Sequence, residues 1–227
     1  MGAGRALCAG MDIREGSLFV PEEQIPEEYS NLKYLKVDDE LKRKVYGLRR
    51  ISEIIIRLRR ISQPVIAAVK GPAAGGGFAL AIAADIRIAG ESAKFNAAFI
   101  NIGLTGTDMD TSYFLPRLKG LSRASEILYT GRFVNAQEAE RIGFVSRVVP
   151  DDKLLESAMD LARELPKKSP LGLRLTKETI NQNIDAPNLE AAILLENRNQ
   201  TICMSTRDFS EGVTAFSERR NPIYGKR

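Results

Sequence analysis

Three consecutive glycines, Gly75 to Gly77, are the residues whose spacing most directly suggests chemistry. They follow an apolar run, Pro64 to Val69, and precede a helix-forming segment, Phe78 to Ala84. We therefore expect a strand that ends, a tight turn and a helix that begins. Glycine lets a ligand approach the main chain closely, and the first N–H groups of a helix carry the positive end of its dipole. Such a turn could stabilise a developing oxyanion, or the glycines could only allow the helix to pack closely on the strand.

The candidate proton carriers are limited, because the sequence contains no histidine. This excludes a Ser-His-Asp or Cys-His nucleophile and argues against a zinc site. Proton transfer must then use a carboxylate, Lys, Tyr, Cys or bound water. The turn-rich segment GLTGTDMD, residues 103–110, holds two carboxylates, Asp108 and Asp110. Either could act as an acid or base; the alternative is that an Asp caps the helix expected from about Thr111.

Composition places the chain among globular proteins. Its 227 residues, 44% of them hydrophobic, are enough for one large domain or a core with an appendage. No apolar run approaches the roughly 20 residues of a membrane span, and the N-terminus lacks the apolar region of a secretory signal. Two cysteines without metal-ligand spacing, Cys8 and Cys203, indicate a reducing compartment, and we expect a cytoplasmic protein. The net charge of +4 permits anionic ligands but gives no argument for nucleic acid, and we expect no membrane partner.

An amphipathic helix is expected over residues 40–62, where apolar residues recur at steps of three and four. Basic residues lie along or beside its polar face: Arg49, Arg50, Arg57, Arg59 and Arg60. We interpret them as a solvated face. A contact to phosphate or RNA is the alternative.

The kinds of secondary structure that the sequence predicts change near Pro150. Before it, strands are expected at Pro64–Val69, Asp85–Ala89, Ala93–Phe99 and Gly143–Val149, with helices at 111–118, 122–128 and 135–142 between them. The last of these helices should begin at Asn135 as N-cap, with Glu138 at capping-box spacing. After it, only helices are expected, at 152–165, 170–183, 188–204 and 207–219. We predict an α/β core over residues 1–150 and a C-terminal helical region over 151–227.

Three segments taken together resemble the crotonase superfamily, the enoyl-CoA hydratase/isomerase family. They are Cys8-Ala9-Gly10-Met11-Asp12, the triple glycine followed by DIRIA at 85–89, and EGVTAFSERR at 211–220. The resemblance runs from about residue 3 to the C-terminus. It implies a crotonase-like spiral of ββα units with a C-terminal helical trimerisation region, so a homotrimer or hexamer. The first segment of the chain resembles a loop that follows a strand, but no strand precedes it. We therefore expect that the first strands of such a spiral are missing from the chain.

The resemblance also implies a site and a substrate, an acyl-CoA thioester, with no metal and no separate cofactor. Two backbone N–H groups, those of Met11 and Gly76, would polarise the thioester carbonyl and stabilise an enolate. The residues expected to bind the substrate are Ala9, Gly10, Met11, Asp12, Ile13, Arg14, Gly75, Gly76, Phe99, Phe216 and Arg219. Of these, Phe216 and Arg219 match positions that reach the CoA of a neighbouring subunit.

Two positions depart from the family pattern. Hydratases of this family use two glutamates, and Ala79 and Phe99 stand in their places, so the two-glutamate mechanism is not expected here. Asp108 falls near the aspartate that dienoyl-CoA isomerases use, with a one-residue insertion in the loop, and Asp110 falls where glycine is common. We expect an enoyl-CoA hydratase or double-bond isomerase. The alternatives are an acyl-CoA hydrolase or decarboxylase, or a catalytically weak CoA- or RNA-binding member.

Overall fold

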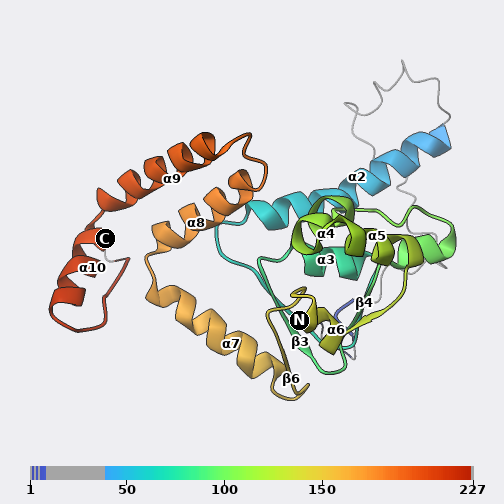
Figure 1. Ribbon diagram of the computed structural model, residues 1–227, viewed down its shortest axis with the longest axis horizontal. Coiled ribbons are helices and arrows are strands. Elements are labelled where there is room, and N and C mark those ends of the chain that lie inside the picture. Colours follow the sequence, from blue (N-terminus) through green and yellow to red (C-terminus); the bar gives the residue numbers. More distant parts are fainter. Residues whose placement is uncertain (1, 3, 5, 9–38, 226–227) are drawn as a thin grey trace. The chain divides into compact units, whose positions relative to one another are not determined.

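The computed structural model describes residues 2, 4, 6–8 and 39–225, and it divides the chain into two units (Figure 1). The first unit holds Met1–Arg59 and Ala67–Leu154, and the second holds Arg60–Ile66 and Leu155–Arg227. Apart from Ile66, every strand residue in the described part of the chain belongs to the first unit. The second unit is built from helices.

Two three-stranded sheets organise the described part of the first unit, in the orders β1-β3-β6 and β2-β4-β5. The strands are β1 (Ile66–Val69), β2 (Pro72–Ala74), β3 (Ile86–Gly90), β4 (Lys94–Asn96), β5 (Val134–Asn135) and β6 (Arg147–Val149). Strands β2 and β4 run parallel, as do β3 and β6, whereas β5 pairs antiparallel with β4. A parallel bridge from Cys8 to Ala73 places the start of the chain beside β2.

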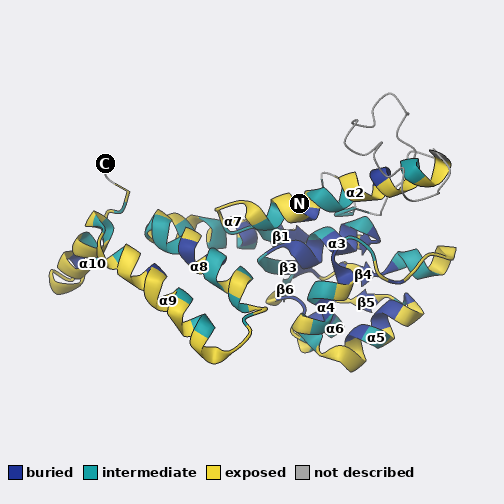
Figure 2. Ribbon diagram, turned by 90° about the horizontal axis from the view of Figure 1, so that it is seen from above, coloured by how far each residue is buried: buried dark blue, intermediate teal, exposed yellow. Residues whose placement is uncertain are grey.

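The helices of the first unit supply much of the core, which appears dark blue in Figure 2. They are α2 (Asp39–Arg60), α3 (Gly76–Ala83), α4 (Thr111–Lys119), α5 (Leu121–Thr130), α6 (Ala136–Arg141) and the 3-10 helix η3 (Ala98–Ile102). Helix α3 is apolar on every side and is almost completely buried, which is the pattern of a core helix. The Phe144 ring packs against Phe95, at 5.0 Å between centroids and edge to face, and against Phe78, at 5.8 Å. Helix α3 is therefore held by dense packing rather than by surface contacts.

The second unit contains four longer helical segments. They are α7 (Leu154–Glu164), α8 (Pro170–Asn183), α9 (Leu189–Met204) and α10 (Arg207–Ser217), with the 3-10 helix η4 (Leu165–Lys167) after α7. The side chains of Ser169, Asn188 and Thr206 cap the N-termini of the last three. Arg198 on α9 forms an ion pair with Glu178 on α8 at 2.9 Å, which joins these two helices.

The segment after α10 folds back on that helix. Arg220 binds Glu211 through two nitrogens, at 2.6 and 3.0 Å. The N–H of Ile223 donates to Glu211 Oε1 at 2.8 Å, and the N–H of Gly225 donates to Asp208 Oδ1 at 2.9 Å. Two acidic side chains of α10 thus hold the described end of the chain.

Most expected elements are confirmed, and α8 begins and ends where the sequence predicts. The cap at Asn135 is also confirmed, because its Oδ1 accepts the Glu138 N–H at 2.8 Å. The Glu138 carboxylate binds Arg132 at 2.7 and 2.9 Å. The sequence missed β2, and the strand expected over 93–99 is only β4 followed by η3.

The helix expected over 40–62 is confirmed as α2, but its apolar stripe is only partly buried. Tyr46 and Ile55 are buried, whereas Leu41, Val45 and Leu48 are more than 40% exposed. Burial on this helix is therefore limited to a few positions and does not follow the whole apolar stripe.

Candidate functional site

The glycine turn joins β2 to α3. Gly75 adopts φ +52° and ψ −119°, a conformation that favours glycine, and its N–H donates to the carbonyl of Asn96 on β4 at 3.2 Å. The first bond within α3 runs from the Ala79 N–H to the Gly75 carbonyl, at 3.0 Å. The N–H groups of Gly76, Gly77 and Phe78 precede this bond and form the positive end of the helix.

A β-carbon would meet different surroundings at each of the three glycines. A β-carbon on Gly77 would overlap the carbonyl oxygen of Cys8, so this position serves close packing. A β-carbon on Gly75 would lie 3.4 Å from the Phe99 ring, and one on Gly76 would lie 3.5 Å from Met109 Sδ. Both of these are ordinary contacts. The packing interpretation of the triple glycine is confirmed for Gly77. The Gly76 N–H lies at the start of α3, and its oxyanion role stays a prediction.

The start of the chain is anchored at the same turn. The Cys8 carbonyl accepts the N–H of Ala74 at 3.1 Å, directly before the glycines. The parallel bridge between Cys8 and Ala73 places Cys8 beside the last residues of β2, directly before the glycine turn. Met11 and the other substrate-binding residues expected over 9–14 lie outside the described residues.

A second turn carries the two candidate carboxylates. The Asp108 carbonyl accepts the N–H groups of Asp110 and Thr111, at 2.7 and 3.1 Å, and Asp108 Oδ1 accepts the Met109 N–H at 2.7 Å. Met109 has φ +59°, which is uncommon for a residue with a long side chain. This turn presents the Met109 sulfur to Gly76, so the Asp108 turn and the glycine turn lie close together.

Asp110 lies at the N-cap position of α4 but makes no capping bond, so the capping alternative is wrong for its side chain. The residue is only 7% exposed, and neither carboxylate oxygen has a hydrogen-bond partner among the described residues. The pKa of Asp110 is raised to about 8, mainly by burial and in smaller part by the nearby Asp108, while Arg59 and Arg87 oppose the rise. A carboxyl with this pKa is mostly protonated at neutral pH.

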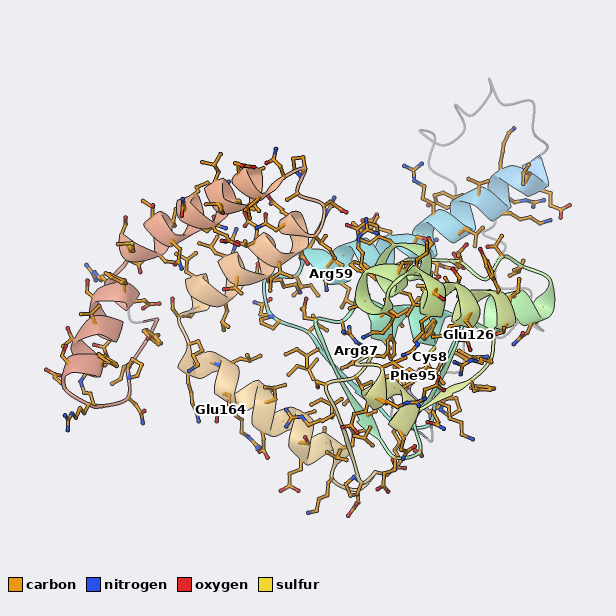
Figure 3. All side chains as sticks on the ribbon, in the orientation of Figure 1. Cys8, Arg59, Arg87, Phe95, Glu126 and Glu164 are labelled. Carbon is orange, nitrogen blue, oxygen red and sulfur yellow. The ribbon has the colours of Figure 1, made fainter. Side chains whose placement is uncertain are left out.

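Two arginines that the sequence analysis did not place in the site lie at the other end of α3 (Figure 3). The interpretation of Arg59 as part of a solvated face is wrong, because its side chain is 19% exposed and pairs with Asp85 at 2.8 Å. Arg57 and Arg60 on the same helix are exposed, as expected. Helical periodicity identifies the polar face of a helix, but it does not show which residues of other elements pack against that face.

The remaining expected site residues fall in both units. Ala79 is completely buried in α3, and the Phe99 ring borders Gly75. Phe216, at the end of α10, is 87% exposed, and Arg219 has φ +54°. Their expected role toward a neighbouring subunit stays a prediction.

Two features of the described residues bear on binding partners. No group of three or more Cys, Asp or Glu side chains there could hold a metal ion. No helix in the described ranges is long and apolar enough to cross a membrane.

Comparison with known proteins decides the family. The model of the family described as enoyl-CoA hydratase/isomerase matches residues 1–227. This chain belongs to that family. A probable enoyl-CoA hydratase EchA12 of Mycobacterium tuberculosis is 44% identical over 227 residues, covering 98% of this chain and 74% of that protein. The 1,2-epoxyphenylacetyl-CoA isomerase of Escherichia coli is 34% identical over 223 residues, covering 98% of this chain and 78% of that protein.

The same family accounts for the fold. A putative enoyl-CoA hydratase from Streptomyces coelicolor matches with a TM-score of 0.85 and 35% identity, covering the whole of this chain and 76% of the solved chain. The prediction of a crotonase-like α/β fold is therefore confirmed.

Proposed function

We propose that this member of the enoyl-CoA hydratase/isomerase family moves a double bond in an enoyl-CoA thioester through an enolate intermediate. The thioester oxygen would bind the N–H of Gly76, at the start of α3, and the N–H of Met11, three residues after the anchored Cys8. Backbone amides suit this role because they do not lose their proton at neutral pH. The buried helix keeps the Gly76 amide in place, so this donor needs no reorganisation when charge develops.

The observation that carries the proposal is the contact between the two turns. Met109 Sδ approaches Gly76, and its backbone N–H is bound by the carboxylate of Asp108. A substrate carbonyl at the Gly76 N–H would therefore have its neighbouring carbons near the Asp108 turn. Sites that form an enolate need this combination of an oxyanion donor and a base.

The two carboxyl groups have different environments, which favours different roles. Asp108 is partly exposed and can meet a ligand, whereas Asp110 is buried. We assign Asp108 as the base that takes a proton from the α-carbon and returns it to the γ-carbon. The C–H electron pair moves into the thioester, whose oxygen carries the charge until reprotonation. The protonated Asp110 then adds no second negative charge beside the enolate.

Hydration is the second candidate, because the relative in M. tuberculosis is named a probable enoyl-CoA hydratase. Isomerisation needs one shuttling base, whereas hydration by the two-glutamate mechanism needs carboxylates where this chain has Ala79 and Phe99. A panel of substrates separates the candidates. Crotonyl-CoA reports hydration, 3-enoyl-CoA and 2,4-dienoyl-CoA report isomerisation, and release of free CoA reports hydrolysis.

The direct test of the oxyanion role is Gly76→Pro. Gly76 is the first residue of α3, where proline is well tolerated, so the substitution removes one N–H without breaking the helix. We expect kcat to fall roughly 100- to 1,000-fold, as for loss of one oxyanion donor. CoA binding should stay measurable. Turnover at the parental rate by a folded Gly76→Pro protein would exclude the role of this amide.

We also propose that the protein is a homotrimer or hexamer assembled through its second unit. The four helical segments there expose many large apolar side chains: Leu155, Met159, Ile180, Leu189, Leu194, Met204, Val213 and Phe216. Such surface is typical of association sites. Light scattering on the purified chain should give the mass of three or six copies, and a monomer at micromolar concentration would contradict this.

A further inference from the structure

Helix α3 lacks the local features that usually stabilise the two ends of a helix. It spans only eight residues, about 12 Å at 1.5 Å per residue. It has no side-chain cap, no acidic residue in its first turn and no basic residue in its last turn. The final carbonyl groups of such a helix need partners from elsewhere.

Those partners are two guanidinium groups from distant parts of the sequence. Arg59, on α2, donates from Nη1 to the carbonyl of Ala83 at 3.0 Å and to Asp85 Oδ1 at 2.8 Å. Its guanidinium also lies 5.1 Å from the centre of the Phe114 ring on α4. Arg59 thus joins the end of α3 to two neighbouring helices.

Arg87, on β3, completes the arrangement. Its Nη1 donates to the carbonyls of Ile82 and Ala84, at 3.1 and 2.7 Å, and its Nε donates to the Phe144 carbonyl at 2.7 Å. Burial and the nearby Arg59 lower the pKa of Arg87. Three successive carbonyls, those of residues 82, 83 and 84, are therefore bound by arginine.

We propose that Arg59 and Arg87 are positioning residues, which fix the carboxyl end of α3 and thereby set the position of the Gly76 N–H at its amino end. This inference rests on the proposed oxyanion role of Gly76. A helix of two turns moves as a rigid rod, so a tilt at Ala83 moves Gly76 as well. The two cations also stabilise the negative end of the helix dipole, which strengthens the positive end that faces the substrate oxygen.

Arg59→Gln is the first test, with Arg57→Gln as the matched control. Arg57 lies on the same helix but is exposed, and it pairs with Glu53, four residues away, at 3.3 Å. We expect Arg59→Gln to lower kcat roughly 10- to 100-fold, the size of effect that a small misplacement produces, with KM within about twofold. Arg57→Gln should leave both unchanged.

A spectroscopic readout separates positioning from general loss of stability. Butanoyl-CoA labelled with ¹³C at the thioester carbonyl cannot react by double-bond migration, and its carbonyl stretching frequency falls as hydrogen bonds to the oxygen strengthen. We expect the parental protein and Arg57→Gln to give the same downward shift. In Arg59→Gln the shift should be smaller, at a temperature where circular dichroism shows each protein folded.

Arg87→Lys provides a second variant in case Arg59→Gln does not fold. A lysine keeps the charge but can bind fewer of the three carbonyls that Arg87 reaches. We therefore expect an intermediate carbonyl shift and an intermediate kcat. An unchanged shift and kcat in either folded arginine variant would overturn the positioning role. Absence of any shift in the parental protein would instead overturn the proposed oxyanion site, so the two failures are distinguishable.

Discussion

The carbonyl oxygen of Cys8 lies so close to Gly77 that a β-carbon on Gly77 would overlap it. This contact joins the first residues of the chain to the first turn of α3. It therefore connects the two segments that are proposed to supply the oxyanion donors. Gly77 is the residue that permits the approach, while Gly76 is the residue whose N–H is proposed to bind the substrate.

The first prediction compares Gly77→Ala with Gly76→Ala. Alanine at position 77 must displace a backbone carbonyl, so we expect a loss of about 1–3 kcal/mol in the free energy of unfolding. Alanine at position 76 meets only Met109 Sδ at 3.5 Å and keeps its N–H, so stability should change by less than about 1 kcal/mol. Urea unfolding of both variants checks this. Equal losses would show that the Cys8 contact does not limit position 77.

The second prediction concerns the pH dependence of stability. Burial raises the pKa of Asp110 from 3.8 to about 8, so between these values the folded protein holds a proton that the unfolded chain releases. The contribution of this bound proton to the free energy of unfolding is fully present below about pH 4 and is lost as the pH rises toward 8. Asp110→Asn cannot ionise. Relative to the parental protein, the free energy of unfolding of Asp110→Asn should therefore rise by roughly 1 kcal/mol for each pH unit between about pH 4 and pH 8.

Urea unfolding at pH 5, 6, 7 and 8 measures this difference. Asp152→Asn, which changes an exposed carboxyl near the start of α7, is the control and should follow the parental curve. Parallel curves for Asp110→Asn and the parental protein would show that Asp110 ionises normally in the folded state.

The third prediction separates the two aspartates by activity. Asp108→Asn removes the proposed base, and we expect turnover of a 3-enoyl-CoA to fall at least about 100-fold. Asp110→Asn keeps a neutral side chain of similar shape, so turnover should stay within about tenfold. Steady-state kinetics on both variants decides the assignment. A larger loss in Asp110→Asn would transfer the base to that residue.

The fourth prediction tests the cap of α6. Asn135→Ala loses the acceptor for the Glu138 N–H, and we expect a loss of about 1 kcal/mol in stability. Asn135→Asp retains the acceptor and places a negative charge at the helix start, so it should be at least as stable as the parental protein. Thermal unfolding of the pair checks this, and equal losses would point to a packing effect at position 135.

Local signals in the sequence were sufficient for several elements. Ser169 followed by Pro170 is a strong start signal, and α8 begins there. The Asn135 cap was readable because it depends on residues three apart. The family could also be predicted from the sequence, because the resemblance rests on the order of three short segments along the chain.

Tertiary contacts decided the features that were missed. Strand β2, with the sequence Pro-Ala-Ala, has little strand propensity and is a strand because Cys8 and β4 lie beside it. Arg59 looked solvated because its partner, Asp85, is 26 residues away. The burial of Asp110 and the approach of Met109 to Gly76 likewise depend on how α3 and α4 pack together.

The folded-back end of the chain has a practical consequence for anyone preparing this protein. Truncation at residue 220 would remove the two amide donors, at Ile223 and Gly225, that Glu211 and Asp208 accept on α10. A purification handle appended after Arg227 would leave both contacts available. Extensions are therefore a safer choice than deletions at this terminus.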